Sequence, residues 1–192
     1  MNREEWLIRA VEKMGPYFME RGYPLSTVRV SVGWPHRARK LTIGQCFVKR
    51  CASDEVSQIF ISPVLADPIQ ALETLVHELL HAAMDCEGGH GAGFVKGMRA
   101  LGLSGKPTAT IAGPELREWL KALNAELGDY PHAALNPTIQ TKKQTTRLLK
   151  VECGDCGYTA RVTAKWLDSV GAPICPCNHE HMNEGKKEEG DK

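Results

Sequence analysis

The sequence of 192 residues predicts an α+β protein, in which a mixed domain is followed by a small cysteine-rich module. Two observations lead to this prediction. Three short strand-like runs precede a long amphipathic helix and further helical segments, and four of the seven cysteines lie as two close pairs within the last 40 residues. We therefore expect a domain over 1–130, a linker over 131–147, a cysteine module over 148–181 and a disordered charged tail over 182–192.

Composition and charge restrict the class of protein. The chain is 42% apolar and 24% charged with a formal net charge of +1, which is typical of a globular protein and gives no overall field that would attract nucleic acid or membrane. The first residues lack the apolar region of a signal peptide, and no run of about 18 apolar residues occurs. We expect a cytoplasmic protein without membrane contact, whose odd number of cysteines argues against a disulfide scaffold.

The N-terminal part predicts one helix and three strands. Apolar residues recur at helical spacing over 3–20, where Gly15 and Pro16 could interrupt or end the helix. Strand-like runs follow at 27–34, 40–48 and 56–65, separated by turn-rich or charged residues.

The central helix is the best-defined element of the sequence. Asp67 is placed to cap it and Pro68 to begin it. One apolar stripe then runs along it, formed by Ile69, Leu72, Val76, Leu79, Leu80 and Ala83. The helix should end near the glycine-rich segment 87–93. Further helices are expected over 94–101 and from Pro114 to Leu127, with an irregular stretch or a short strand between them.

The same helix contains the pattern "HELLH". His77 and His81 are four residues apart, so their rings project from one face, one turn above the other. Two such imidazoles can bind one Zn²⁺, and Glu78 beside the first of them is then the general base toward a zinc-bound water. This chemistry hydrolyses peptide bonds.

A catalytic zinc needs a third protein ligand. His90 is the natural candidate, because the glycines around it allow the chain to turn sharply after the helix. A glutamate from a later helix is the alternative, and Glu115 and Glu118 are the residues in question. Candidates for stabilising the oxyanion are Tyr130, His132 and His36, among which the sequence makes no choice.

The stretches "LVHELLHA", "GGHGAGF" and "LGLSGKPTAT", with the C-terminal cysteines, resemble the SprT-like metallopeptidase family, most closely its short bacterial and prophage members and more distantly Spartan-type proteases. The resemblance implies a zincin-like core, in which a small sheet precedes the zinc helix. It also implies that His77, His81 and His90 bind zinc and that Glu78 is catalytic. Spartan-type relatives cleave proteins crosslinked to DNA, but place the third histidine farther downstream than His90.

The C-terminal cysteines predict a second zinc site of the zinc-ribbon type. Cys153 and Cys156 form one pair and Cys175 and Cys177 the other, so that four thiolates can surround one tetrahedral ion. Because the second pair has only one residue between its cysteines, His179 is an alternative to Cys177. A closed set of four ligands is structural, and the metal would supply folding free energy to so small a module. A short strand over 158–162 is expected, against which Trp166 and Leu167 could pack.

The remaining cysteines, Cys46, Cys51 and Cys86, are expected to be small core or surface residues rather than ligands. Two basic segments, 36–50 and 142–165, could contact phosphates, so DNA is a candidate partner through them and through the ribbon. The prediction is thus a zinc-dependent metallopeptidase with one catalytic and one structural Zn²⁺, acting on a protein or peptide, with DNA-associated proteins as a candidate class of substrate. The alternatives are a non-catalytic zinc protein that binds nucleic acid or protein, and a hydrolase that acts on another bond.

Overall fold

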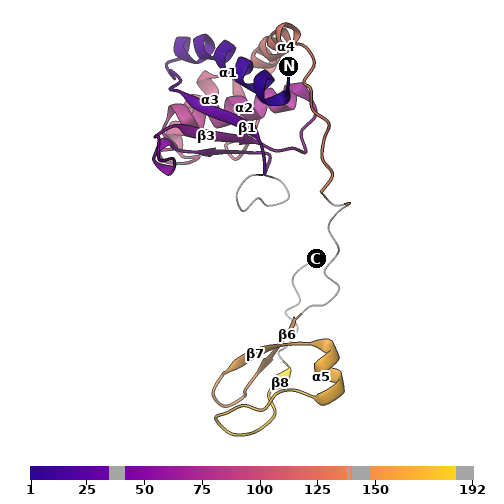
Figure 1. Ribbon diagram of the computed structural model, residues 1–192. Helices are drawn as coiled ribbons and strands as arrows, with labels where there is room; N and C mark the ends of the chain where they lie inside the picture. Colours follow the sequence, from indigo (N-terminus) through magenta and orange to yellow (C-terminus); the bar gives the residue numbers. More distant parts are fainter. Residues whose placement is uncertain (35–41, 138, 140–147, 185–192) are drawn as a thin grey trace. The chain divides into compact units, whose positions relative to one another are not determined.

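The computed structural model describes residues 1–34, 42–137, 139 and 148–184, and the chain forms two compact units, Met1–Pro137 and Thr138–Lys192 (Figure 1). Three parts of the chain lie outside the described residues: 35–41, most of 138–147, and 185–192. The first of them contains the start of the predicted basic segment 36–50 and the candidate His36. Each unit has a core of its own.

The first unit begins with helix α1 (Arg3–Glu20), whose N-terminus is capped by a capping box between Asn2 and Glu5. Pro16 lies inside this helix and does not end it. The buried apolar face continues on both sides of the proline, from Trp6 to Phe18, and its packing outweighs the loss of one backbone hydrogen bond.

A three-stranded sheet follows, formed by β1 (Val28–Val32), β2 (Gly44–Phe47) and β3 (Ser57–Ile61). The strand order is β1-β3-β2, with β1 parallel and β2 antiparallel to β3, and a short 3₁₀ helix η1 (Lys49–Cys51) lies between β2 and β3 in the chain. This strand order places β2 at an edge of the sheet. All three strands were predicted from the sequence.

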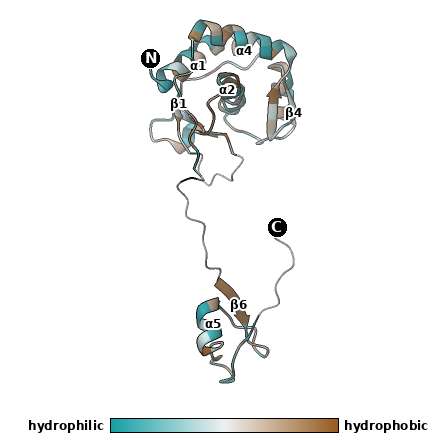
Figure 2. Cartoon of the chain, turned by 90° about the vertical axis from the view of Figure 1, so that its right-hand side faces the viewer, coloured by the Kyte–Doolittle hydropathy of each residue, from teal (hydrophilic) through white to brown (hydrophobic). Residues whose placement is uncertain are grey.

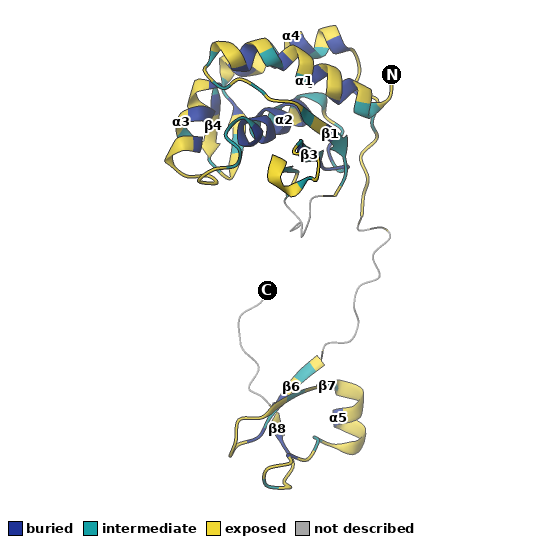
Figure 3. Ribbon diagram, turned by 60° about the vertical axis from the view of Figure 1, so that its left-hand side comes forward, coloured by how far each residue is buried: buried dark blue, intermediate teal, exposed yellow. Residues whose placement is uncertain are grey.

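Helix α2 (Pro68–Ala83) is the centre of the first unit, and it has the predicted cap at Asp67 and the predicted proline at its start. It contacts β2, β3, α3, α4 and β5. Figure 2 views α2 nearly end-on, and Figure 3 shows it mostly buried beneath α1 and α4. Because it is covered on nearly all sides, any polar side chain that it carries must find a partner inside the unit.

The unit is completed by helix α3 (Ala92–Ala100), the hairpin of β4 (Leu103–Lys106) and β5 (Ala109–Ala112), and helix α4 (Pro114–Leu127). The sequence predicted both helices, and for the segment of the hairpin it predicted either an irregular stretch or a short strand. The segment that was predicted to be a linker from residue 131 belongs at its start to the first unit. His132 Nε2 and the Leu135 N–H both donate to the Pro63 carbonyl, at 2.9 and 2.8 Å. These bonds hold the start of that segment against the first unit.

The second unit is a small sheet with one helix. Its strands β6 (Leu148–Glu152), β7 (Thr159–Thr163) and β8 (Asn183–Glu184) have the order β7-β6-β8, and helix α5 (Ala164–Val170) follows β7. The core is formed by Val151, Cys153, Leu167, Cys175 and Met182.

Two expectations for this unit are corrected. Trp166 does not pack against the sheet, since its side chain is 55% exposed, whereas Leu167 one position later faces the core. The module also extends past 181, because Met182 is 4% exposed and β8 pairs with β6. The ordered part therefore reaches Glu184, within the segment that was expected to be a disordered tail.

Among the described residues, no helix is both long and apolar enough to cross a membrane.

Candidate metal centres

Three imidazoles converge in the first unit. The Nε2 atom of His90 lies 3.2 Å from Nε2 of His77 and 3.1 Å from Nε2 of His81. An ion bound tetrahedrally by imidazoles would separate the nitrogen atoms by about 3.3 Å, given Zn–N bonds of about 2.0–2.1 Å. The three side chains therefore fit one metal ion of the size and coordination preference of Zn²⁺, and together they could hold one.

His90 reaches the helix through a tight loop. The Cys86 N–H donates to the His81 carbonyl at 2.8 Å, and the backbone takes left-handed conformations at Asp85, Cys86, Gly88 and Gly89. These conformations reverse the chain within a few residues, at low cost at the glycines and at about 1 kcal/mol for each other residue. The glycines of this segment thus serve the turn that the sequence predicted.

One aromatic ring lies against all three histidines. Phe94, 1% exposed and near the start of α3, has its ring centroid 4.4 Å from that of His81, nearly parallel to it. It lies 4.9 Å from the ring of His77 and 5.0 Å from the ring of His90. Sequence reasoning missed this contact, although an apolar residue one helical turn after His90 was a usable signal.

Thr110 orients the first histidine. Its Oγ1 atom, on β5, lies 2.8 Å from Nδ1 of His77. In the tautomer that carries its proton on Nδ1, His77 donates to this hydroxyl and keeps a lone pair on Nε2 for a metal. No local pattern in the sequence links Thr110 to His77, because the two are joined only by the fold.

The three histidine side chains are neutral at ordinary pH. Burial, with the neighbouring imidazoles His81 and His90, lowers the pKa of His77 to about 3. Burial and His90 lower the pKa of His81 to about 4. Since a protonated imidazole cannot bind a metal, these shifts keep the site ready for an ion well below neutral pH.

Glu78 is buried beside this group, 6% exposed. Burial and the nearby Cys86 raise its pKa to about 8, while a hydrogen bond from the Cys46 N–H acts in the opposite direction. Strand β2 approaches the carboxyl group so closely that a Cβ at Gly44 would lie 2.6 Å from Glu78 Oε1. A glycine inside a strand often marks such an approach, so this signal was present in the sequence.

A cavity of about 600 Å³ opens over these groups. Its walls come from β2, from α2, from the loop before His90 and from the β4–β5 hairpin, and they include Cys46, Thr74, Cys86 and Thr110. The arrangement has three ligand atoms, one buried carboxyl group and room for a bound molecule.

The other candidate residues lie elsewhere. Glu118 pairs with Lys121 at 2.6 Å on the surface, and Glu115 lies near Tyr17. Tyr130 packs against Trp6, with ring centroids 4.6 Å apart, and His132 bonds to Pro63. None of these four candidates lines the cavity, so it is His90 that joins the two helix histidines, rather than a glutamate of α4.

A family model described as the SprT-like family matches residues 10–112 of the chain, which include the sheet, α2, His90 and the hairpin. The chain belongs to the SprT-like family. No curated protein and no solved structure matches it significantly. The family supports a zinc metallopeptidase as the class of protein to consider, and the histidine group lies inside the matched residues.

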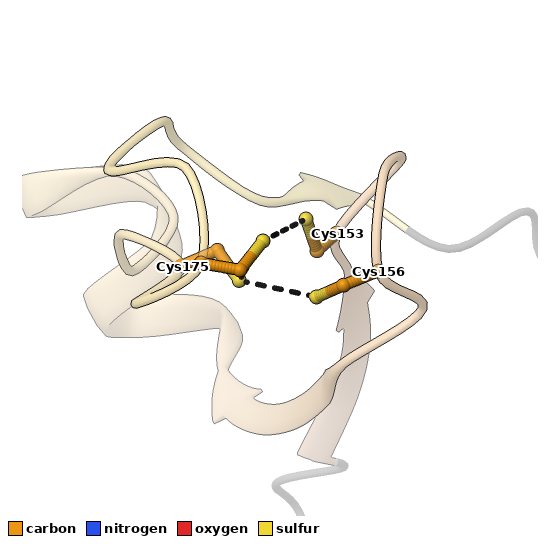
Figure 4. A group of neighbouring side chains, drawn as sticks. Cys153, Cys156 and Cys175 are labelled. Atoms are coloured by element: carbon orange, nitrogen blue, oxygen red, sulfur yellow. Dashed lines mark hydrogen bonds between the residues drawn. The ribbon is translucent and has the colours of Figure 1, made fainter.

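The second candidate centre of this SprT-like chain lies outside the matched residues. The sulfur atoms of Cys153 and Cys177 are 3.7 Å apart, those of Cys156 and Cys175 are 3.6 Å apart, and those of Cys175 and Cys177 are 3.4 Å apart. Figure 4 shows Cys153 and Cys156 facing Cys175. A zinc ion 2.3 Å from each sulfur would separate them by about 3.8 Å, so four thiolates fit one such ion.

Two further features favour this set of four cysteines. His179, the alternative ligand, is not part of the group, and its backbone N–H donates to the Cys175 carbonyl at 2.9 Å. The backbone N–H groups of Cys156 and Asp155 lower the pKa of the Cys153 thiol to about 7, which favours the thiolate that a metal requires. Cys177 rather than His179 thus completes the group.

Proposed function

We propose that the protein is a zinc-dependent metallopeptidase that hydrolyses peptide bonds, with His77, His81 and His90 as ligands of the catalytic zinc. The observation that carries this proposal is the convergence of three Nε2 atoms beside the buried carboxyl group of Glu78. Three protein ligands leave one coordination position open, as catalytic zinc requires, whereas four cysteines close the second site, which we assign a structural role.

Glu78 is the proposed general base. When bound, Zn²⁺ would lower the pKa of a water molecule and polarise the scissile carbonyl. The carboxylate accepts the proton of the attacking water and passes it to the leaving amine. Burial favours the protonated form of Glu78, so the acid formed in the first step can persist until the amine departs.

The substrate is proposed to bind as an extended chain along β2. The Ser62 N–H donates to the Ile43 carbonyl at 2.9 Å. Because hydrogen-bonded and non-bonded pairs alternate in an antiparallel ladder, the backbone groups of Gly44 and Cys46 then point away from β3. The Cys46 N–H already meets Glu78, and Gly44 is left beside the cavity with groups that can pair with a peptide.

The test is the variant Glu78→Gln in the zinc-loaded full chain, with unfolded casein as substrate. Cleavage should fall by at least about 100-fold, while the bound zinc stays the same. Glu87→Gln is the matched control. Glu87 is an exposed acid of the loop before His90, so this variant should cleave casein as fast as the parent protein. Undiminished cleavage by Glu78→Gln would remove this residue from the mechanism.

A contact with DNA is the second proposal, and it rests on the ribbon. Lys150 and Arg161 are direct partners across β6 and β7, and Lys165 lies 4.9 Å from the ring centroid of the exposed Trp166. Cations beside an exposed aromatic ring suit phosphates and unstacked bases. Replacing Lys150, Arg161, Lys165 and Trp166 by alanine should weaken salt-dependent binding to single-stranded DNA, and unchanged binding would exclude this surface.

A further inference from the structure

Two thiols that belong to neither metal group meet in the wall of the cavity. Cys46 comes from β2 and Cys86 from the loop that leads to His90, and their side chains are hydrogen-bonded to each other. Both line the cavity beside Glu78. Sequence analysis treated them as unrelated small residues, because only the fold brings them together.

The backbone conformation of the loop positions Cys86 in the wall of the cavity. Asp85 and Cys86 both have left-handed backbone conformations, with φ of 52° each, which non-glycine residues rarely adopt. The bond from the Cys86 N–H to the His81 carbonyl and the ion pair of Asp85 with Lys49, at 3.3 Å, fix the turn. Conformations of this cost persist only where the surroundings impose them.

The surroundings of the two thiols shift their pKa values in opposite directions. The hydrogen bond from Cys46, with the nearby charge of Arg50, lowers the pKa of Cys86. The same bond and burial raise the pKa of Cys46. Since the thiolate is the nucleophile, these directions favour Cys86 as the thiol that attacks an oxidant first and Cys46 as the neighbour that resolves the product.

We propose that Cys46 and Cys86 form a reversible disulfide in the wall of the cavity, with hydrogen peroxide as the oxidant. The Cys86 thiolate attacks one peroxide oxygen and the O–O bond breaks, which gives a sulfenic acid and hydroxide. The sulfur of Cys46 then attacks the sulfur of Cys86, the S–O bond breaks, and the oxygen leaves as water with the proton of Cys46. Two thiols are oxidised, one peroxide is reduced to two waters, and a dithiol reductant reverses the reaction.

The disulfide would act on the walls of the cavity. It would tie β2 to the segment that carries His90, so that these two walls could no longer move apart to admit a substrate. We expect the oxidised protein to cleave casein more slowly than the reduced protein. This last expectation rests on the proposed function, whereas formation of the disulfide does not.

The test uses the zinc-loaded full chain with Cys51→Ser, treated with peroxide, alkylated and digested with trypsin. Cys46 then lies in peptide 41–49 and Cys86 in peptide 51–96, each as the only cysteine of its peptide. We expect one cross-linked species whose mass is the sum of both peptides less two hydrogen atoms, and which dithiothreitol separates. With Cys46→Ser added, Cys86 should be trapped by dimedone as a sulfenic acid.

Two results would overturn the proposal. One is the absence of the cross-linked peptide while Cys86 is oxidised to the sulfinic acid. The other is equally fast oxidation of Cys46 when Cys86 is replaced by serine, since Cys46 is expected to react only through Cys86. Because the readout is a mass, a reduced protein that cleaves no casein would contradict the proposed function and leave the disulfide intact.

Discussion

The Nδ1 atom of His77 lies 2.8 Å from the hydroxyl oxygen of Thr110, so a strand of the β4–β5 hairpin sets the ring orientation of a residue on α2. This hydrogen bond faces away from the side of the ring that meets His90. It holds the ring in place and is compatible with the tautomer that carries its proton on Nδ1, which leaves the lone pair of Nε2 directed toward the other histidines.

Replacing Thr110 by valine should therefore weaken zinc binding at the histidine site by about 10–100-fold. Valine keeps the shape of threonine and removes only the hydroxyl. Thr110→Ser is the matched control, because it keeps the oxygen and should retain most of the affinity. The measurement is competition with a chromophoric chelator, and equal affinities of the valine and serine variants would show that the hydroxyl has no part in binding.

Glu78 should destabilise the metal-free fold near neutral pH. Because its pKa is raised from 4.5 to about 8, the folded chain keeps a proton that the unfolded chain releases between these values, and stability falls as pH rises through that window. Glu78→Gln removes this cost, so chelator-treated Glu78→Gln should be more stable at pH 7 by up to about 3 kcal/mol.

The check on this prediction is denaturant unfolding of the first unit at several pH values. The difference between the variant and the parent protein should nearly vanish at about pH 3.5, well below the ordinary pKa of 4.5, where both states of the parent hold the proton. A difference that does not change with pH would mean that the gain comes from packing rather than from ionisation.

Metal content should divide between the two sites. The parent chain should bind two zinc ions, and His90→Ala and Cys153→Ser should each bind one, because each variant removes a ligand from a different group. His132→Ala should still bind two, since His132 bonds to Pro63 and lies outside both groups. Metal analysis of the purified variants decides this, and loss of both ions from either single variant would contradict two independent sites.

Helix α2 and its two candidate ligands, His77 and His81, were predictable because their signals are local. The cap at Asp67, the apolar stripe and the spacing of His77 and His81 all lie within a few turns, and the glycines near His90 indicated the returning loop. Whether these residues bind zinc and catalyse remains a prediction that the convergent geometry supports.

Contacts between elements were not predictable in the same way. The approach of Thr110 to His77, and the meeting of Cys46 with Cys86, depend on how β5 and β2 pack around α2. The hairpin was ambiguous because its strands are short and mostly exposed, so they lack a clear apolar alternation. The limits of the linker and of the tail also depend on long-range contacts. Met182 belongs to the core of the second unit, and His132 bonds to Pro63, so both residues are held by partners far away in the sequence.

Gly44 should be sensitive to the smallest side chain. An added Cβ would lie 2.6 Å from Glu78 Oε1 and 2.6 Å from Thr74 Cγ2, so Gly44→Ala must push β2 away from α2 or displace the carboxyl group. We expect a loss of stability of about 1–3 kcal/mol, as for overpacked sites, and a loss of casein cleavage beyond what the reduced folded fraction explains.

Gly15→Ala is the matched control for this substitution. Gly15 lies within α1, and nothing is within 4 Å of its added Cβ, so alanine should stabilise the protein by about 0.5–1 kcal/mol and leave cleavage unchanged. Thermal unfolding and casein cleavage of the two variants, measured side by side, separate a general effect of an extra methyl group from a specific one at the carboxyl group. If Gly44→Ala kept both its stability and its activity, β2 would not press on Glu78, and the proposed binding of a peptide along that strand would lose its structural basis.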